Sequence, residues 1–249
     1  MPLPPLDEQR RIVDILNRAE RIRRLRDAAT ATRRALIPAL FLKMFGDPIE
    51  NPMGWDVRPL GEALRACDYG SSTKASETGE GLPLIRMANV DIQGHLDTGD
   101  LKYVELSEAD NTKYGVEAGD IIFNRTNSKE LVGKTGLWDG RFPAVLASYF
   151  IRLRVKTDIV APVFVWAYFN TPAMKKKLYA TARGAIGQAN INAKELSAFA
   201  LPLPPLEKQR QFGDLVEGII TGGAMADTAA TTATALAAAL TSRLFGEAA

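Results

Sequence analysis

The chain has 249 residues, of which 46% are hydrophobic, so it can fill the core of one large domain, or of a domain with appendages, and is not a disordered chain. Its 31 Lys and Arg residues nearly balance 29 Asp and Glu residues, which excludes a uniformly basic coat for nucleic acid but allows a local basic face. The single cysteine, Cys67, excludes an internal disulfide and a thiolate metal cluster, and fits a reducing cytosol.

The sequence also argues against a membrane. The start, MPLPPLDEQRR, lacks the apolar core of a secretory signal. No window approaches the roughly 18 uninterrupted apolar residues of a membrane-spanning helix. We therefore expect a cytoplasmic protein with no membrane partner.

The first predicted element is a long helix that starts near residue 6. The run PLPPL is extended, and the acidic pair Asp7 and Glu8 suits the positive first turn of a helix. A helix of about 40 residues would be about 60 Å long, too long for an ordinary compact core, so it needs a partner helix. Residues at spacings of three and four predict the packing seam: Ile12, Ile15, Ala19, Ile22, Leu25, Ala29, Thr32, Leu36 and Leu40.

The same helix is rich in arginine. Nine arginines lie between residues 10 and 34, whereas the corresponding stretch near the C-terminus has only Arg210 and Arg243. A solvated charged face is the favoured interpretation. Contact with phosphates or with an acidic partner is the alternative, because the guanidinium group binds anions in a bidentate manner.

Residues 48–200 have a different residue pattern, in which short apolar runs are separated by Gly, Asn, Asp and Pro. Runs rich in Ile, Val, Phe and Tyr between turn signals predict strands. The stretch from Ala161 to Ala182 has helical spacing instead, broken at Pro172. This region is therefore predicted to be a mixed α/β domain of an ordinary size. The strand candidates are LPLIRMANV, GDIIFNRTNS, AVLASYFIRLRV and FALPL.

The last region repeats the first at a constant offset of 200 residues. PLPPL returns at 202–206, and identities continue through Gln209, Arg210 and Asp214 to Phe245-Gly246. We interpret this as a genuine internal repeat of one structural unit. The repeat predicts a second helix with a kink at Gly222-Gly223. Close packing along the Ala/Thr-rich run 226–240 is the favoured interpretation, and low-complexity filler is the alternative. Because one helix enters the middle domain and the other leaves it, the two must run antiparallel if they pack together.

These elements give an α+β fold: a globular mixed α/β domain flanked by two long helices that form an antiparallel coiled-coil hairpin. The predicted regions are 1–47, 48–200 and 201–249.

The sequence predicts no catalytic residue and no metal ligand. The only histidine, His95, lies in a turn-like setting, and Asp120 and Glu130 do not form a nuclease arrangement. The segment Asn51–Gly54 has only a faint likeness to an Asn-Pro-Pro-aromatic methyltransferase motif, and we interpret it as a turn. An enzyme with unrecognised motifs is retained as a rival that catalytic activity of the isolated chain would support.

Binding chemistry is better represented, in three polar clusters at 69–74, 125–134 and 183–192. Arg suits guanine, Asn suits adenine, and Ser, Thr and Lys suit phosphates, so clusters beside a basic helix favour nucleic acid. A polar surface loop is the alternative for each cluster taken alone. The candidate DNA-binding residues are Ser72, Lys74, Arg86, Asn89, Arg125, Thr126, Asn127, Ser128, Lys134, Arg183, Gln188, Asn190 and Asn192.

Several motifs together resemble the specificity (S) subunits of type I restriction-modification systems. They are G-x-x-x-Q-x-N-I-N followed by P-L-P-P-L-x-x-Q-R, G-D-I-I-F-x-R-T-N in mid-domain, and MFG or LFG closing a long helix. The resemblance implies a target-recognition domain at 48–200 between two spacer-helix regions. It also implies a non-catalytic subunit that directs methyltransferase subunits, and a restriction subunit, to a bipartite site in double-stranded DNA. S-adenosylmethionine would then bind in the partner adenine methyltransferase and not in this chain.

The sequence departs from the family pattern in one respect. The full pattern alternates two recognition domains with two helices, whereas a single recognition domain is present here. Two-part specificity then needs a second copy, most simply in a homodimer on a palindromic site. A helical-hairpin protein-interaction module without DNA specificity remains the alternative function.

Overall fold

The computed structural model describes residues 5–76, 79–185, 188–222 and 235. The chain divides into two compact units. The first, here called the helical unit, comprises residues 1–37 and 215–249, and the second, here called the lobe, comprises residues 38–214. No helix within the described ranges combines the length and apolarity that a membrane crossing requires.

The long helix α1 spans Leu6–Phe45, which confirms both the predicted start and the predicted length. In the helical unit its charged face is exposed to solvent. Arginines on this face pair with acidic residues one turn away, as in Arg18 with Asp14 at 2.8 Å and Arg23 with Glu20 at 2.8 Å. Such pairs between exposed side chains support an isolated helix only slightly.

The predicted seam of α1 is only partly right. Ile12 is buried and Ile15 and Ala19 are partly buried, but Leu25 is 61% exposed and Leu36 is 46% exposed. Burial at the end of the helix follows Ile37, Phe41 and Phe45, which recur every four residues. Phe41 and Phe45 are buried because their rings pack against those of Phe164 and Phe212.

The second repeat is described over its first part. Residues 206–222 are helical, as the sequence predicts for the segment that follows the second proline-rich run. The Ala/Thr-rich run 226–240, and with it the expected close packing, lies outside the described residues except for Ala235. The predicted kink at Gly222-Gly223 falls at the end of the described stretch.

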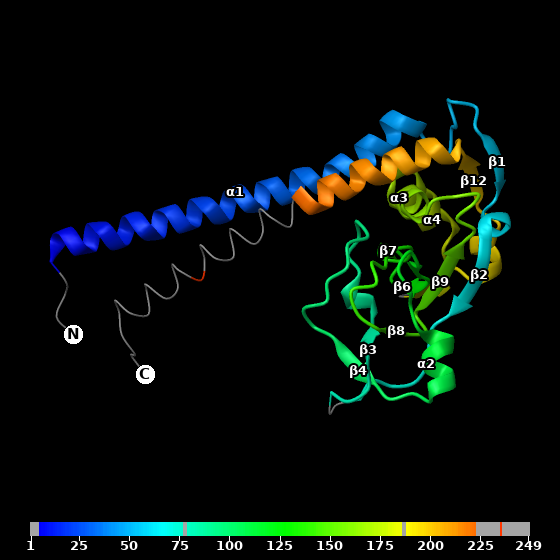
Figure 1. Ribbon diagram of the computed structural model, residues 1–249, viewed down its shortest axis with the longest axis horizontal. Coiled ribbons are helices and arrows are strands. Elements are labelled where there is room, and N and C mark those ends of the chain that lie inside the picture. The colour runs from blue at the N-terminus through cyan, green and yellow to red at the C-terminus, as the bar shows by residue number, and fades with distance from the viewer. Residues whose placement is uncertain (1–4, 77–78, 186–187, 223–234, 236–249) are drawn as a thin grey trace. The chain divides into compact units, whose positions relative to one another are not determined.

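Between β1 and β12 the described part of the lobe holds twelve strands and four short α-helices, which confirms a mixed α/β region. Figure 1 shows β3, β4 and α2 at one end of the lobe and β1, β12 and α3 at the other. The strands are β1 (Asp56–Pro59), β2 (Leu64–Tyr69), β3 (Leu82–Ile85), β4 (Lys102–Val104), β5 (Ile121–Asn124), β6 (Thr126–Asn127), β7 (Thr135–Leu137), β8 (Val145–Leu146), β9 (Phe150–Val155), β10 (Arg183–Ala185), β11 (Gln188–Asn190) and β12 (Ala200–Leu203). The helices are α2 (Glu108–Tyr114), α3 (Pro162–Asn170), α4 (Pro172–Thr181) and α5 (Ala193–Ser197).

These strands form four small sheets, with the orders β1-β12, β10-β11-β6, β2-β9-β5-β7 and β4-β3-β8. All the predicted strand runs contain strands, although LPLIRMANV continues from β3 into a 3-10 turn at Met87–Asn89. The break at Pro172 is also confirmed, because Thr171 ends α3 and its hydroxyl accepts a hydrogen bond from Met174 N at the start of α4.

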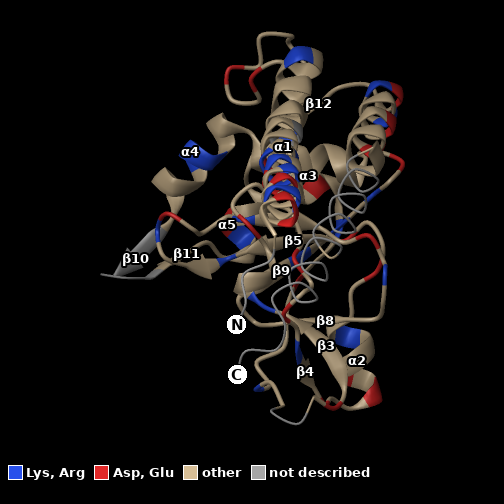
Figure 2. Cartoon of the chain, turned by 90° about the vertical axis from the view of Figure 1, so that its left-hand side faces the viewer, with Lys and Arg blue, Asp and Glu red and all other residues tan. Residues whose placement is uncertain are grey.

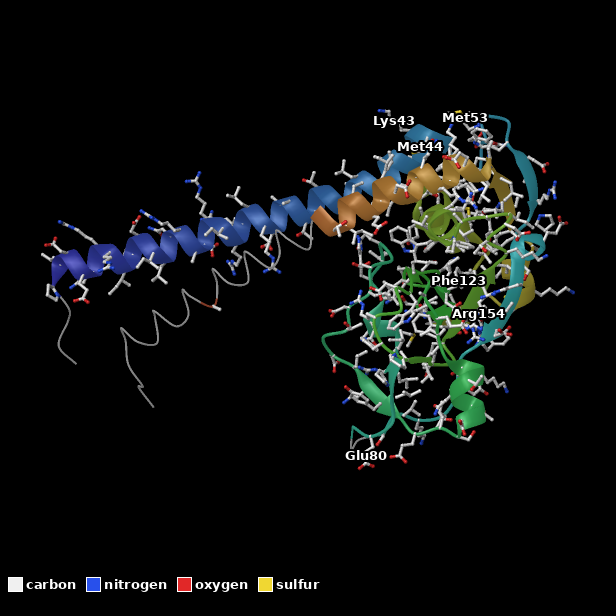
Figure 3. All side chains as sticks on the ribbon, viewed as in Figure 1. Lys43, Met44, Met53, Glu80, Phe123 and Arg154 are labelled. Carbon is white, nitrogen blue, oxygen red and sulfur yellow. The ribbon has the colours of Figure 1, made fainter. Side chains whose placement is uncertain are left out.

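The core of the lobe is built on β5, whose four residues are all buried. Figure 3 shows Phe123 among the side chains inside the lobe, and its ring lies 5.4 Å from that of Phe169 on α3. One buried carboxylate borders this core. Asp120 accepts hydrogen bonds from Arg154 at 2.9 Å and from Glu117 N at 2.9 Å, so its charge is compensated on two sides.

The C-terminal end of α1 and the start of the helix at 206–222 meet inside the lobe around Phe164 of α3. Its ring lies 5.2 Å from Phe41 and 4.9 Å from Phe45, and Phe212 lies 5.4 Å from Phe45. The motif glutamine of the second repeat completes the attachment. Gln209 is fully buried, accepts from Ala161 N at 2.8 Å and donates to Pro204 O at 2.8 Å. The PLPPL-x-x-Q motif therefore fixes a helix to the start of α3.

Candidate functional site

Two of the predicted polar clusters are neighbours in one sheet. β11 pairs with β6 in an antiparallel register that places Asn190 opposite Thr126 and Ala189 opposite Asn127. The backbone continues this contact where Ile191 N donates to Arg125 O at 3.0 Å. Segments about 65 residues apart in the sequence thus form one surface.

The third cluster joins the same place through its first residues. Ser148 N donates to Ser71 O at 2.7 Å, and Arg125 N donates to Tyr149 O at 2.9 Å, so 69–71 and 125 lie on either side of the turn before β9. Tyr69 also contacts the segment that follows β11, because its hydroxyl accepts a hydrogen bond from Ala193 N at 3.1 Å. We call the meeting point of residues 69–71, 125–128 and 189–193 the polar junction.

Arg125 occupies the middle of the polar junction. Its guanidinium carbon lies 4.8 Å from the centre of the Tyr69 ring, within the range of a cation–π interaction. Its Nη1 donates to Ser148 O at 3.2 Å. The Tyr69 side chain is 44% exposed, so the stacked pair lies at the surface of the lobe.

A buried asparagine at the end of β5 holds the connection to β6, which carries Arg125. Asn124 is fully buried, and its Nδ2 donates to Thr126 O at 3.3 Å and to Tyr149 O at 3.2 Å. Its Oδ1 accepts from Asn127 Nδ2 at 2.9 Å. Sequence reasoning missed Asn124. The available signal was a polar residue closing an apolar strand directly before Arg125.

Other candidate residues also have structural partners. Asn192 caps α5, since its Oδ1 accepts from Glu195 N at 2.9 Å while Glu195 accepts from Asn192 N at 3.0 Å. Asn127 Oδ1 accepts from Ser128 N at 2.9 Å. The side chains of Arg183 and Gln188 lie outside the described residues, and only their strand pairing is known: Arg183 faces Asn190 and Gln188 faces Ala185.

Three of the candidates have side chains that turn to a different part of the lobe. Asn89 is buried and donates to Asp97 O and Asp100 O, and Arg86 pairs with Asp100 at 3.2 Å. Lys134 is buried and donates to Met87 O at 2.5 Å. These contacts stabilise the 3-10 turn at Met87–Asn89 and its surroundings, and the structure does not bring the three side chains to the polar junction.

A second lysine near this turn was not anticipated from the sequence. Lys175 on α4 donates to Gly133 O at 2.9 Å. Burial lowers its pKa to about 7, with the charge of Asp91 opposing the shift and that of Lys134 adding to it. Burial also lowers the pKa of Lys134. Figure 2 shows basic segments on α4 and α5, the two helices that flank β11 in the sequence.

The residues usually associated with catalysis have ordinary environments here. His95 lies 3.3 Å from Asp91 in a turn, and burial raises the pKa of the Cys67 thiol, which makes it less nucleophilic. Over the described part of the chain, no group of three His, Cys, Asp or Glu residues is arranged to hold a metal ion. The arrangement offers hydrogen-bond donors and acceptors on a firm frame, which is chemistry for binding.

The chain matches one protein family over most of the lobe. Residues 52–221 match the family described as the type I restriction modification DNA specificity domain. Among curated proteins, it is 29% identical over 169 residues to a Methanocaldococcus jannaschii protein named for the MjaX type I restriction enzyme specificity subunit. It is 30% identical over 162 residues to the EcoKI specificity subunit of Escherichia coli. The alignments cover 67% and 64% of this chain but only 40% and 34% of those proteins, so the chain spans less than half of their length.

Solved structures are similar over nearly the whole chain. The HsdS subunit from Thermoanaerobacter tengcongensis is similar with a TM-score of 0.51 and 25% identity, over 96% of this chain and 58% of that one. A chain from a type I R-M system is similar with a TM-score of 0.59 and 23% identity, over the same shares of the two chains. At 23% identity, the similarity to this chain shows a shared fold and nothing more.

Proposed function

Because the chain belongs to the type I restriction modification DNA specificity domain family, we propose that it recognises a DNA sequence on behalf of a restriction-modification complex. In this proposal it is a non-catalytic, cytoplasmic subunit that directs adenine methyltransferase subunits, and a restriction subunit, to their site. S-adenosylmethionine would bind in the methyltransferase. The observation that supports this proposal best is the polar junction, where three distant polar segments meet on one face of a single lobe.

The polar junction suits recognition of base edges for a physical reason. Base readout needs donors and acceptors held at fixed positions, because a flexible side chain loses entropy when it binds. Asn124 is buried behind the strand and Tyr69 lies under Arg125, so the exposed groups rest on a rigid support. Arg125, Asn127, Gln188 and Asn190 are our candidates for base contacts. Ser72, Lys74, Thr126, Ser128, Arg183 and Asn192 are candidates for contacts nearby.

The long helices would set distances on the DNA. We propose that the two repeats form the antiparallel coiled-coil hairpin expected from the sequence, and that it separates recognition lobes and offers a docking surface for the methyltransferase. The aromatic cluster around Phe164, where both helices join the lobe, supports this proposal. Since α1 has 40 residues, its length is about 60 Å, or one to two turns of duplex at about 35 Å per turn.

A single lobe reads only a few base pairs, so a bipartite site requires a second lobe. We propose that a homodimer supplies it on a palindromic site. Light scattering of the chain with DNA and methyltransferase would return two copies of the chain per complex. One copy in that assembly would refute the homodimer without affecting recognition by the lobe.

The function is tested by mapping methylated adenines in a host that expresses the chain with its methyltransferase. We expect one sequence motif to be methylated, and no motif when the chain is omitted. Asn127→Ala and Gln188→Ala should each change or abolish methylation at that motif, whereas Lys102→Ala, on the distant strand β4, should not. Unchanged methylation in both variants would show that the base contacts are assigned to the wrong residues.

A further inference from the structure

Arg125 differs from the other arginines described between residues 48 and 200 in having no acidic partner. The described arginine side chains between residues 48 and 200 other than Arg125 all form ion pairs: Arg58, Arg65, Arg86, Arg141, Arg152 and Arg154. Arg125 has no ion pair with any described residue and contacts only a tyrosine ring and a backbone carbonyl. Partial burial of a cation without a counter-charge costs free energy of desolvation. We take this uncompensated cost as a sign that Arg125 has a binding role.

The donors of Arg125 are not equivalent. A guanidinium has five N–H groups. The Nε atom is enclosed and has no hydrogen-bond partner, and Nη1 uses one N–H for Ser148 O. The remaining donors are the second N–H of Nη1 and both N–H groups of Nη2. They lie side by side at the end of the planar guanidinium group, here called the fork. Two parallel donors at this end match the O6 and N7 acceptors of a guanine.

The support beneath the fork limits its orientation. Tyr69 stacks on the guanidinium and is itself held by the hydrogen bond from Ala193 N to its hydroxyl. The strand is fixed where Arg125 N donates to Tyr149 O and Ile191 N donates to Arg125 O. A phosphate contact would not need such a fixed plane, because a phosphate can be approached from many directions, whereas guanine presents its two acceptors in one plane.

We propose that Arg125 reads a guanine in the target sequence through a bidentate contact in the major groove, and that Tyr69 is the positioning residue that orients its guanidinium. This inference rests on the proposed function and adds a base identity to it. The side chains already neutralised by carboxylates, such as Arg152 with Asp68, hold the fold and do not read bases.

The test uses the complex of the full chain with its methyltransferase and a duplex that carries the mapped motif. We expect at least one guanine in the motif, and Arg125→Ala should weaken binding about 5- to 160-fold, which corresponds to about 1–3 kcal/mol for a bidentate pair. Replacing that guanine with 7-deazaguanine, which lacks the N7 acceptor, should weaken binding by the native complex but not weaken it further in Arg125→Ala. The matched control is Arg141→Ala, an ion-paired arginine of the same lobe, which should leave binding unchanged.

Variants of the positioning residue separate orientation from folding. Tyr69→Phe keeps the ring and should retain the preference for guanine, whereas Tyr69→Leu removes the ring and should reduce that preference while leaving binding to unrelated DNA unchanged. Arg125→Lys keeps the charge but loses the fork, so it should lose discrimination and keep the unspecific affinity. These readouts remain informative if Arg125→Ala does not fold.

Three results would overturn the inference: a motif without guanine, no guanine whose 7-deaza analogue is coupled to Arg125, or an equal loss on all sequences with a smaller salt dependence, which is the mark of a phosphate contact. A complex that methylates no specific motif with the native chain would instead refute the proposed function itself. That outcome is visible before any variant is made.

Discussion

Within the lobe, Phe212 holds the start of the helix at 206–222 against the end of α1, and its replacement by alanine should be severely destabilising. Phe212 is fully buried, and its ring lies 5.9 Å from Phe41 and 5.4 Å from Phe45 in edge-on geometry. Truncating a buried phenylalanine to alanine costs about 3–5 kcal/mol, because transfer energy is lost and a cavity remains. That loss is a large part of the roughly 5–15 kcal/mol that stabilises a typical protein.

Urea unfolding followed by tryptophan fluorescence measures this loss, because Trp55 donates to Phe45 O and reports on the same region. Phe212→Leu keeps most of the volume and should cost about 1.5 kcal/mol or less. Leu215→Ala is the matched control one turn along the helix. Leu215 is about half exposed, so its truncation should change stability by about 0.5 kcal/mol or less. Equal midpoints for Phe212→Ala and Leu215→Ala would refute the view that the ring cluster anchors the helix.

Three further changes test other parts of the lobe. Asp120→Asn should destabilise the lobe by about 1.5–3 kcal/mol in urea unfolding, because it removes the buried carboxylate of the pair and leaves Arg154 with Glu117 alone; a cost below about 1 kcal/mol would contradict a structural role for this pair. Asn192→Ala should cost about 1 kcal/mol in the same assay, since it removes the cap of α5, and Asn192→Ser should restore most of that loss. Lys175→Met should flatten the rise of stability between about pH 7 and pH 10.5, because the unfolded lysine binds a proton in this range that the buried one has lost, so stability increases with pH. Melting temperatures across this range measure the slope, Lys176→Met is the exposed control, and an unchanged slope in Lys175→Met would contradict the assignment.

The sequence predicted the features of this fold that depend on local chemistry. The start of α1 follows from the extended proline run and the acidic first turn, and the break between α3 and α4 follows from Pro172. The strand β5 follows from the buried run at 121–123. Each of these signals acts within a few residues, so a single sequence is enough to recognise it.

Features that depend on distant partners were predicted less well. The seam was wrong at Leu25 and Leu36, which are exposed, and the sequence did not indicate that α1 is buried near its end through Phe41 and Phe45, whose partners Phe164 and Phe212 lie more than 100 residues away. The contact of Lys134 with DNA stays a prediction, but the sequence did not indicate that its side chain is buried and donates to Met87 O. No spacing in the sequence indicates that contact.

The polar junction was predicted from the sequence only in part. Its three segments were recognised from composition, but their meeting required the pairing of β6 with β11, and the importance of Asn124 required its position behind Arg125. This arrangement separates two kinds of polar residue. Asn124 and Asn192 satisfy backbone groups and so cannot change without loss of stability, whereas Arg125 lacks an acidic partner and can change with less effect on the fold. A new DNA specificity should therefore arise more readily by substitution of Arg125 than of Asn124, Asn127 or Asn192, because the side chains of these three asparagines form hydrogen bonds that hold the surrounding segments.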